Sequence, residues 1–353
     1  MELEMQASID KGISSTLSSL QYDCAAPRNI NDLDLQPDMK DLIDPQPCHN
    51  FTDTSYLHCS VRSLRLRAKL CAIANSLHSP PSFADTLQFE QDIQIALDNL
   101  PHWTDPRALM ASTLLDLQLR QFLIIIHQPL TLYTSSQSKK RPDTSQIYTT
   151  TTTLSAAESI ITLHTALLNA SPPNFALTCL RLDYLRAALL IAHIAYHSSS
   201  PFITRIARPV SEATATASLR LLEERSMRPG RGNHHYWYLS AAISLVSIRF
   251  AEADGKGEEE KEGLSREAGD RVCALLYRVL ALQDEQGEGM PSEVMLGDAG
   301  TVGNTMRTPA SMVEPGFGVD MGGFQGMEAM EGWEGQGTWG LDDFWFLGDL
   351  DGG

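Results

Sequence analysis

The 353-residue sequence lacks the motifs by which most enzymes are recognised. It contains no G-x-S-x-G nucleophile elbow, no P-loop, no H-E-x-x-H zinc-protease motif and no G-x-G-x-x-G sequence that follows a predicted strand. Each of these motifs supplies a reactive side chain or a loop that holds phosphate, so their absence counts against the corresponding enzyme classes. We therefore expect a protein that is not an enzyme.

Closely spaced cysteines are also missing. The six cysteines stand at positions 24, 48, 59, 71, 179 and 273, and no two are closer than eleven residues. This scatter matches neither zinc-ligand spacing nor the dense pattern of a small disulfide scaffold. His193 and His197 share one helical face, but no metalloprotease glutamate and no third ligand lie near them. We predict reduced thiols, no metal site and no cofactor in this chain.

Positive charge is sparse, and negative charge is concentrated at one end. The net charge is −17, and residues 284–353 hold fourteen Asp and Glu against the single Arg307. Residues 1–283 therefore carry a net charge of only −4. Proteins that bind nucleic acid normally need clustered Lys and Arg to displace counterions, and a nearly neutral body does not provide them.

Two short basic groups are too small to change this interpretation. Arg62, Arg65, Arg67 and Lys69 lie on a predicted helix without interleaved aromatic residues, which favours a solvated helix face over a nucleic-acid patch. The sequence Lys-Lys-Arg-Pro at 139–142 lies in a polar segment and is a weak nuclear-import signal. A solvated loop is the favoured interpretation there.

The most apolar stretch runs from Leu100 to Leu132. A helix with so little polar surface must be covered on most sides, so we predict that it is the central helix of a domain. Asp105 can act as its N-cap, Pro106 fits the first helical position, and Pro129 is expected to prevent continuation. Charged and amide side chains interrupt the apolar run, so we predict a buried helix and no membrane span.

Helical periodicity recurs through the rest of residues 1–283, and no β-rich run or internal repeat is present. Further helices are predicted at 1–11, 54–77, 82–100, 150–169, 176–197, 209–227, 236–253 and 264–282. A polar loop is predicted at 133–148, and a charged, glycine-punctuated linker at 254–263.

The composition changes completely after residue 283. Residues 284–353 contain 17 of the 24 glycines, which is incompatible with a stable helix or a packed core. The predicted fold class is therefore all-α, with a multi-helix domain at 1–283 followed by a disordered, acidic, glycine-rich tail at 284–353.

Three stretches make a family resemblance visible. The first is Leu100-Pro-x-Trp103, followed by the long leucine-rich helix that ends in Leu123-Ile-Ile-Ile-His-Gln-Pro129. The second is the segment Pro27-x-Asn-Ile-Asn-Asp-x-Asp34, and the third is the aromatic start of a predicted helix at 234–243. Together they resemble the regulatory middle-homology domain of fungal binuclear zinc-cluster transcription factors. The resemblance implies an all-helical regulatory domain, a nuclear location and a role in RNA polymerase II transcription.

The resemblance does not extend to the family's DNA-binding module, because the six-cysteine zinc cluster has no counterpart among the scattered cysteines. It implies that DNA is contacted only if a zinc cluster is supplied by a longer product or a partner. It also implies that the regulatory domain has lost helices at its amino-terminal end, and that the helical domain can form homo- or hetero-oligomers. The alternative is an all-helical protein-interaction or ligand-binding module with no role in transcription.

The last 21 residues, 333–353, interleave aromatic and leucine side chains with acids. Acidic residues keep apolar side chains solvated until a hydrophobic groove of a partner captures them, so this segment is a candidate activation segment that contacts the transcription machinery or co-activators. Its candidate anchors are Trp339, Phe344, Trp345, Phe346, Leu347 and Leu350. The alternative is an inert tail, which the interspersed glycines favour because they oppose helix formation.

Overall fold

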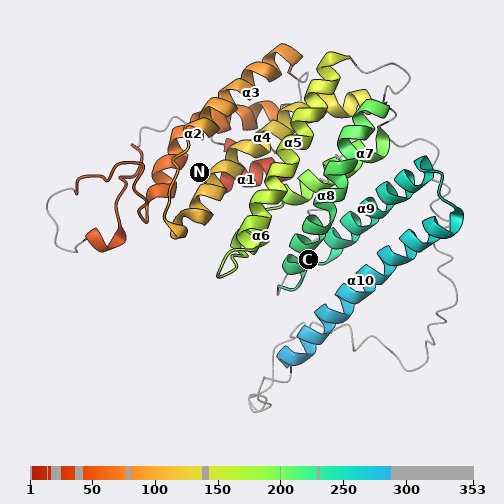
Figure 1. Cartoon of the computed structure of the whole chain (residues 1–353). Helices are drawn as coiled ribbons and strands as arrows, with labels where there is room; N and C mark the ends of the chain where they lie inside the picture. Colours follow the sequence, from red (N-terminus) through yellow and green to blue (C-terminus); the bar gives the residue numbers. More distant parts are fainter. Residues whose placement is uncertain are drawn as a thin grey trace, which may run out of the picture. The chain divides into compact units, whose positions relative to one another are not determined.

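The computed structural model describes residues 2–13, 15–16, 25–35, 43–76, 81–136, 143–198, 200–228 and 231–287. Every regular element in these ranges is a helix, which confirms the all-α fold (Figure 1). By its internal contacts the chain divides into residues 1–280 and 281–353. The six candidate anchors of the tail lie outside the described residues.

The α-helices are α1 (Glu2–Lys11), α2 (Ser55–Ala74), α3 (Phe83–Asp98), α4 (Leu109–Ser136), α5 (Thr144–Leu168), α6 (Ala176–Leu180), α7 (Asp183–His197), α8 (Pro201–Ser226), α9 (His234–Ala253) and α10 (Glu258–Gly287). Two short 3-10 helices accompany them, η2 (Asp32–Asp34) and η3 (Pro106–Ala108).

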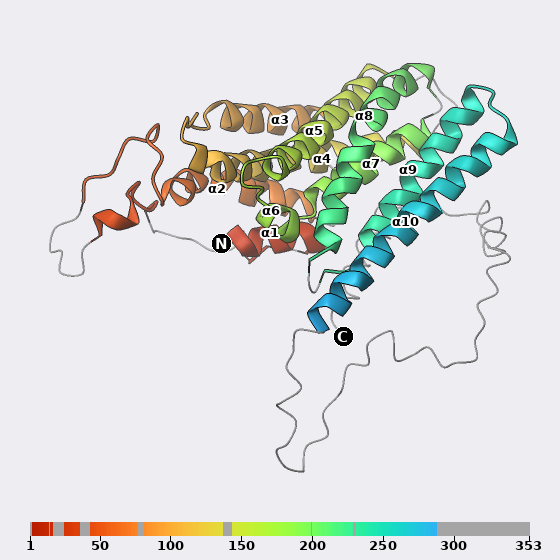
Figure 2. The ribbon, with the colours of Figure 1, turned by 60° about the horizontal axis from the view of Figure 1, so that its bottom comes forward.

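Helix α4 is the buried centre of the amino-terminal half, as predicted. It packs against α2, α3, α5 and α7, and Leu117, Leu119 and Phe122 are completely buried (Figures 1 and 2). The helical stretch Pro106–Thr131 is long and apolar enough to cross a membrane by length and composition alone. Its apolar side chains pack on the neighbouring helices, which is the environment of a core helix in a folded domain.

In the second half of the domain, from α5 to α10, each helix packs against helices close to it in the chain. Helix α5 packs against α4, α7 and α8, and α9 packs against α7 and α8. Helix α10 lies beside α9 in both ribbon views (Figures 1 and 2). Ile160, Tyr184, Leu190 and Leu239 are completely buried and belong to the core of this half.

Two proline predictions are wrong. Pro129 does not end α4, which continues to Ser136 into the predicted loop at 133–148. The Pro129 side chain is exposed, while Ile126 and Thr131 on either side are buried. A proline in a helix interior costs about 3 kcal/mol through a lost backbone hydrogen bond and a ring clash, and here the packing of α4 on its neighbours keeps the helix going. Likewise Pro209 lies inside α8, which begins at Pro201.

Two other boundaries differ from the prediction. Helix α10 begins at Glu258, inside the predicted linker at 254–263, and its first turn carries Glu258, Glu259 and Glu260. Acids at a helix N-terminus interact favourably with the helix dipole, so this charge run starts a helix instead of a linker. The single helix predicted at 176–197 is two helices, because Arg181 has an extended backbone between α6 and α7.

Polar side chains on one face of helix α1 bind the neighbouring helices. Glu2 accepts two hydrogen bonds from the buried guanidinium of Arg67 on α2, at 2.5 and 2.7 Å. Ser60 and Gln118 also donate to the Glu2 carboxylate. Burial opposes ionisation of Glu2, but Arg67 outweighs it and holds the pKa of this carboxyl below its ordinary value.

Through two further turns, the same face of α1 reaches Arg181, which precedes α7, and Arg186 on α7. Gln6 accepts a hydrogen bond from Arg181 at 2.8 Å, and Asp10 accepts one from Arg186 at 3.2 Å. Arg181 also pairs with the buried Asp183, which accepts a hydrogen bond from His164 at 2.8 Å when His164 Nε2 carries the proton. Burial raises the pKa of Asp183, but the charges of Arg181 and His164 outweigh it and keep the pKa far below its ordinary value.

Glu2→Gln should lower the free energy of unfolding by about 3 kcal/mol, because it leaves the buried Arg67 charge without its carboxylate. Chemical denaturation followed by circular dichroism measures this difference. Glu262→Gln removes an exposed acid of α10 and is the matched control, which should change stability by less than about 0.5 kcal/mol. Equal effects of the two substitutions would contradict a structural role for the Glu2–Arg67 pair.

His193 should make the protein sensitive to mild acid. Burial, together with the neighbouring His197, lowers the pKa of His193 to about 4, against about 6.5 in an unfolded chain. Between these two values the unfolded state binds a proton that the folded state does not. Stability should therefore be full above pH 6.5 and fall by about 2 kcal/mol by pH 4.5.

The measurement is denaturation of the parent and of His193→Gln between pH 7 and pH 4.5. The variant should show a shallower fall, with the remaining slope due to His127 and His197, whose pKa values burial also lowers. Parallel stability curves for the two proteins would disprove the assignment to His193.

Candidate functional site

A groove lies between α8, α9 and α10. It consists of two adjoining cavities of about 180 Å³ and 670 Å³. Ala215, Ile243, Ser247 and Leu264 line both cavities, so the two form one groove. Small-molecule sites usually have volumes of about 300–1,000 Å³, and the larger cavity falls within this range.

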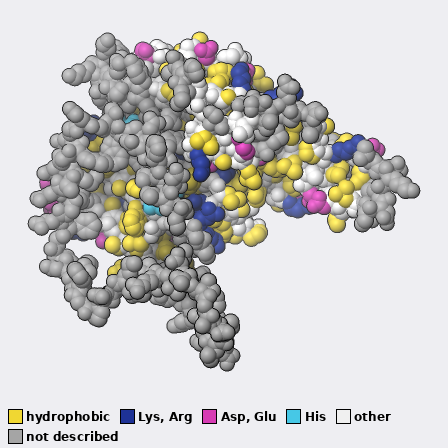
Figure 3. All heavy atoms as spheres, turned by 180° about the vertical axis from the view of Figure 1, so that it is seen from behind, with side chains coloured by type: hydrophobic (Ala, Val, Ile, Leu, Met, Phe, Trp, Pro, Cys, Tyr) yellow, Lys and Arg dark blue, Asp and Glu magenta, His cyan; other side chains and the backbone are white. Residues whose placement is uncertain are grey.

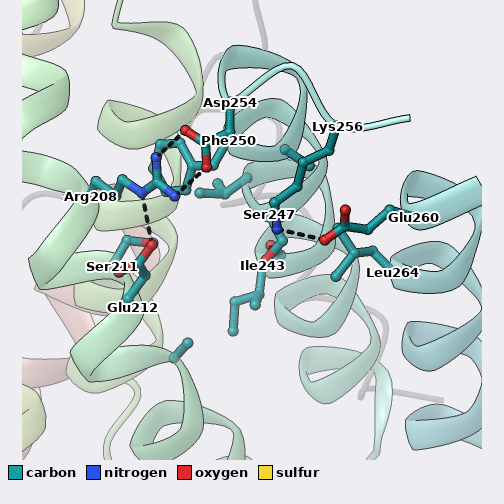
Figure 4. A pocket seen from close by; sticks show the side chains of 13 residues that line it. Arg208, Ser211, Glu212, Ile243, Ser247, Phe250, Asp254, Lys256, Glu260 and Leu264 are labelled. Carbon is teal, nitrogen blue, oxygen red and sulfur yellow. Dashed lines mark hydrogen bonds and ion pairs between the residues drawn. The ribbon is translucent and has the colours of Figure 1, made fainter. Parts of the chain in front are cut away.

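One side of the smaller cavity is formed by Arg208, which binds two carboxylates (Figure 4). Arg208 on α8 donates to both carboxylate oxygens of Asp254, at 2.9 and 2.7 Å, and to Glu212 at 2.9 Å. Its guanidinium carbon lies 4.9 Å from the centre of the Phe250 ring. The hydrogen bonds to Asp254 and Glu212 raise the pKa of Arg208, and Arg208 lowers the pKa of Asp254.

This arrangement fixes the turn that joins α9 to α10. Asp254 follows the last residue of α9, and Gly255 adopts a φ of 73°, which disfavours a side chain. Lys256 then pairs with Glu260 in the first turn of α10, at 2.5 Å. Arg208 therefore holds α8 to the turn that leads into α10, and three of its five N–H groups donate within the protein.

The larger cavity combines an apolar wall with polar groups. Leu219, Ile243 and Leu264 supply apolar surface from three different helices. Tyr236 and Ser244 lie two turns apart on one face of α9, and both are buried. Arg271 on α10 donates to the Ser244 hydroxyl at 3.1 Å, which joins the two helices across the cavity.

The sequence did not single out Arg208 or Arg271. A visible signal for Arg208 was the spacing of Arg208 and Glu212, four residues apart on one helix face. The partner residue Asp254 is 46 positions away, so no local pattern indicated the pair. Arg271 stands in a helix whose acidic and basic residues alternate, and this pattern is typical of a solvated surface.

The other residues noted in the sequence do not form a site. The rings of His193 and His197 lie 4.5 Å apart, but the described residues include no group of three His, Cys, Asp or Glu side chains that could hold a metal. Arg67 was expected on a solvated face and is buried against Glu2, whereas Arg65 and Lys69 are exposed. On the face drawn in Figure 3, Lys and Arg lie in small groups among hydrophobic side chains.

Arg208→Met should loosen the α9–α10 turn without unfolding the core, because Asp254 and Glu212 lose their common partner. We expect faster amide hydrogen exchange at 251–264, with little change in α4 and α5. The measurement is hydrogen exchange by mass spectrometry. Arg205→Met, on an exposed position of the same helix, is the matched control and should exchange like the parent protein. Unchanged exchange at 251–264 in Arg208→Met would show that the ion pair does not hold the turn.

Comparison with known proteins gives partial matches. No family model and no solved structure matches the chain. The chain is 28% identical over 139 residues to the transcription factor lepE of Aspergillus flavus, covering 37% of this chain and 16% of that protein. It is 23% identical over 139 residues to the transcription factor phm2 of a Pyrenochaetopsis species, covering 36% and 18%. For the transcription factor opdR of Penicillium oxalicum, identity is 24% over 156 residues, covering 40% and 19%.

Each match spans less than a fifth of the relative's own length. All three relatives are named as transcription factors, which agrees with the expectation that this chain is not an enzyme. These similarities support a fungal transcription regulator in general.

Proposed function

We propose that this chain is the regulatory and activating portion of a fungal regulator of RNA polymerase II transcription. The observation that carries the proposal is the partial similarity to three proteins named as transcription factors. In this proposal the helical residues 1–283 form the regulatory domain, and contact with DNA comes from a zinc cluster in a longer product or in a partner.

The acidic tail at 284–353 is the activating part in this proposal. Its last 21 residues combine three tryptophan or phenylalanine residues in a row with acids on both sides, Asp342-Asp343 and Asp349. Acids keep the apolar side chains in water until a co-activator groove captures them, and folding on binding makes such contacts reversible. The anchors are Trp339, Phe344, Trp345, Phe346, Leu347 and Leu350.

The test is a reporter assay with residues 331–353 fused to an unrelated DNA-binding domain. We expect activation well above the DNA-binding domain alone, and a return to background when Phe344, Trp345, Phe346 and Leu347 are all changed to Ala, because the apolar anchors supply the binding energy.

A fusion of residues 300–322 is the matched control, since this stretch has the same length and comes from the same tail but contains no tryptophan. It should not activate. Activation by the alanine variant at the level of the parent segment would disprove the role of the aromatic anchors. No activation by 331–353 would reject the segment as an activator.

A further inference from the structure

A cysteine and a histidine meet near the start of α2. The Sγ atom of Cys48, which precedes α2, lies 3.3 Å from Nε2 of His58 in the first turn of the helix. The other ring nitrogen, Nδ1, lies 2.7 Å from the backbone carbonyl oxygen of Pro27. A carbonyl oxygen accepts hydrogen bonds and cannot donate them, so Nδ1 carries the proton. In the neutral ring Nε2 is then an acceptor, and the thiol of Cys48 donates to it.

The loop that carries the thiol is fixed on both sides of Cys48. The buried side-chain amide of Asn29 donates to the carbonyl oxygens of Pro47 and Asn50, each at 3.1 Å. The carbonyl oxygen of Cys48 itself accepts a hydrogen bond from the indole Nε1 of Trp103 at 2.9 Å. These bonds hold the backbone on either side of the thiol, so the thiol is presented to the imidazole by a built loop.

The Cys48 thiol combines access to solvent with a neighbouring base. Cys48 is half-buried, and His49 beside it is exposed. Cys59 and Cys71 are buried, and burial raises the pKa of each of these two thiols to about 11. Buried thiols in apolar surroundings are inert, because the thiolate is the nucleophile. Cys59 and Cys71 are therefore structural, whereas Cys48 is placed to react.

A thiol hydrogen-bonded to a neutral imidazole is the arrangement that activates cysteine as a nucleophile. When the sulfur of Cys48 attacks an electrophile, Nε2 of His58 takes the proton. A free thiol with a pKa of about 8.5 is about 3% ionised at pH 7, so a base that removes the proton can raise the rate by up to about thirtyfold.

The reaction that these two side chains can complete by themselves is addition to an activated double bond. The sulfur forms a bond with the β-carbon of an α,β-unsaturated carbonyl compound, and the π electrons move to the carbonyl oxygen. The imidazolium then returns its proton to the α-carbon. An S–H bond and a C=C π bond are replaced by an S–C bond and a C–H bond, so the step needs no leaving group and no oxidant.

The surroundings of the thiol favour an electrophile with an apolar part. Trp103, whose indole binds the Cys48 carbonyl, is half-buried and meets the half-buried ring of Phe51 edge-on, with the ring centres 5.2 Å apart. An apolar group that covers these rings gains free energy in proportion to the apolar area removed from water.

We propose that Cys48 is a modification site for α,β-unsaturated carbonyl compounds, with His58 as the general base of the addition. The adduct replaces the hydrogen bond from the thiol to His58 and places the added group beside the loop that Asn29 and Trp103 hold. The inference goes beyond the transcriptional role and concerns the helical unit alone.

The experiment uses N-ethylmaleimide, an α,β-unsaturated imide, as the probe. The full chain is treated at pH 7 for a series of short times and digested, and mass spectrometry gives the rate of modification of each cysteine. Cys48 should be modified at least tenfold faster than Cys273, although Cys273 is exposed. Cys59 and Cys71 should stay unmodified while the chain is folded.

Variants test the role of His58. His58→Asn should slow the modification of Cys48 at least tenfold at pH 7, because the asparagine amide can donate to the Pro27 carbonyl but cannot take the thiol proton. At pH 9.5 a thiol ionises in water without a base, so the variant and the parent should then react within about threefold of each other. His49→Asn, at the exposed histidine next to Cys48, is the matched control and should react like the parent.

Circular dichroism confirms that each variant is folded, and His58→Gln replaces His58→Asn if the latter fails this check. Modification of Cys273 as fast as Cys48 in the parent would overturn the proposal, as would an unchanged rate at Cys48 in the folded His58 variant. A tenfold deficit that persists at pH 9.5 would also overturn it, because it would show that the substitution blocks access to the thiol. None of these results bears on the reporter assay of the tail, so the two proposals fail separately.

Discussion

The structure depends on covering α4, a helix with too little polar surface to face water. Once α4 is enclosed by α2, α3, α5 and α7, its few polar side chains need partners inside the fold. Gln118 and Gln121 are both buried, and their amides bond to Glu2 and Gln6 of α1. Helix α1 therefore both covers the core and satisfies the polar groups that the core contains.

The existence of the helices could be predicted from the sequence because apolar residues recur with the period of a helix along each element. The helix ends at Pro129 and Pro209 could not, since local signals there oppose helix continuation and burial of neighbouring residues outweighs them. The contacts of α1 could also not be predicted from local sequence patterns. Arg67 lies 65 residues from Glu2, and Arg186 lies 176 residues from Asp10, so only the tertiary fold brings these pairs together.

The groove between α8, α9 and α10 lies beside a helix, α10, that has fewer buried side chains than α4. The sequence predicted an apolar stripe on this helix, and Leu275 is indeed completely buried, whereas Tyr277 and Leu280 are exposed. A helix fixed by few buried side chains packs less closely than α4, and polar contacts then span part of its contact with α8 and α9. Arg271 to Ser244 and Arg278 to Glu223 are such contacts. The residues of both contacts line the larger cavity.

Arg208 and Arg271 show why residue type alone does not determine what an arginine does in a fold. Both line the same groove, and both would count equally in a sequence-based search for anion-binding residues. Arg208 has two carboxylate partners and stacks on Phe250, so its role is to hold a turn. Arg271 has one exposed carboxylate partner and a buried Nε–H without an acceptor. The difference is the number of donors that the fold leaves unfilled, and only the three-dimensional arrangement determines that number.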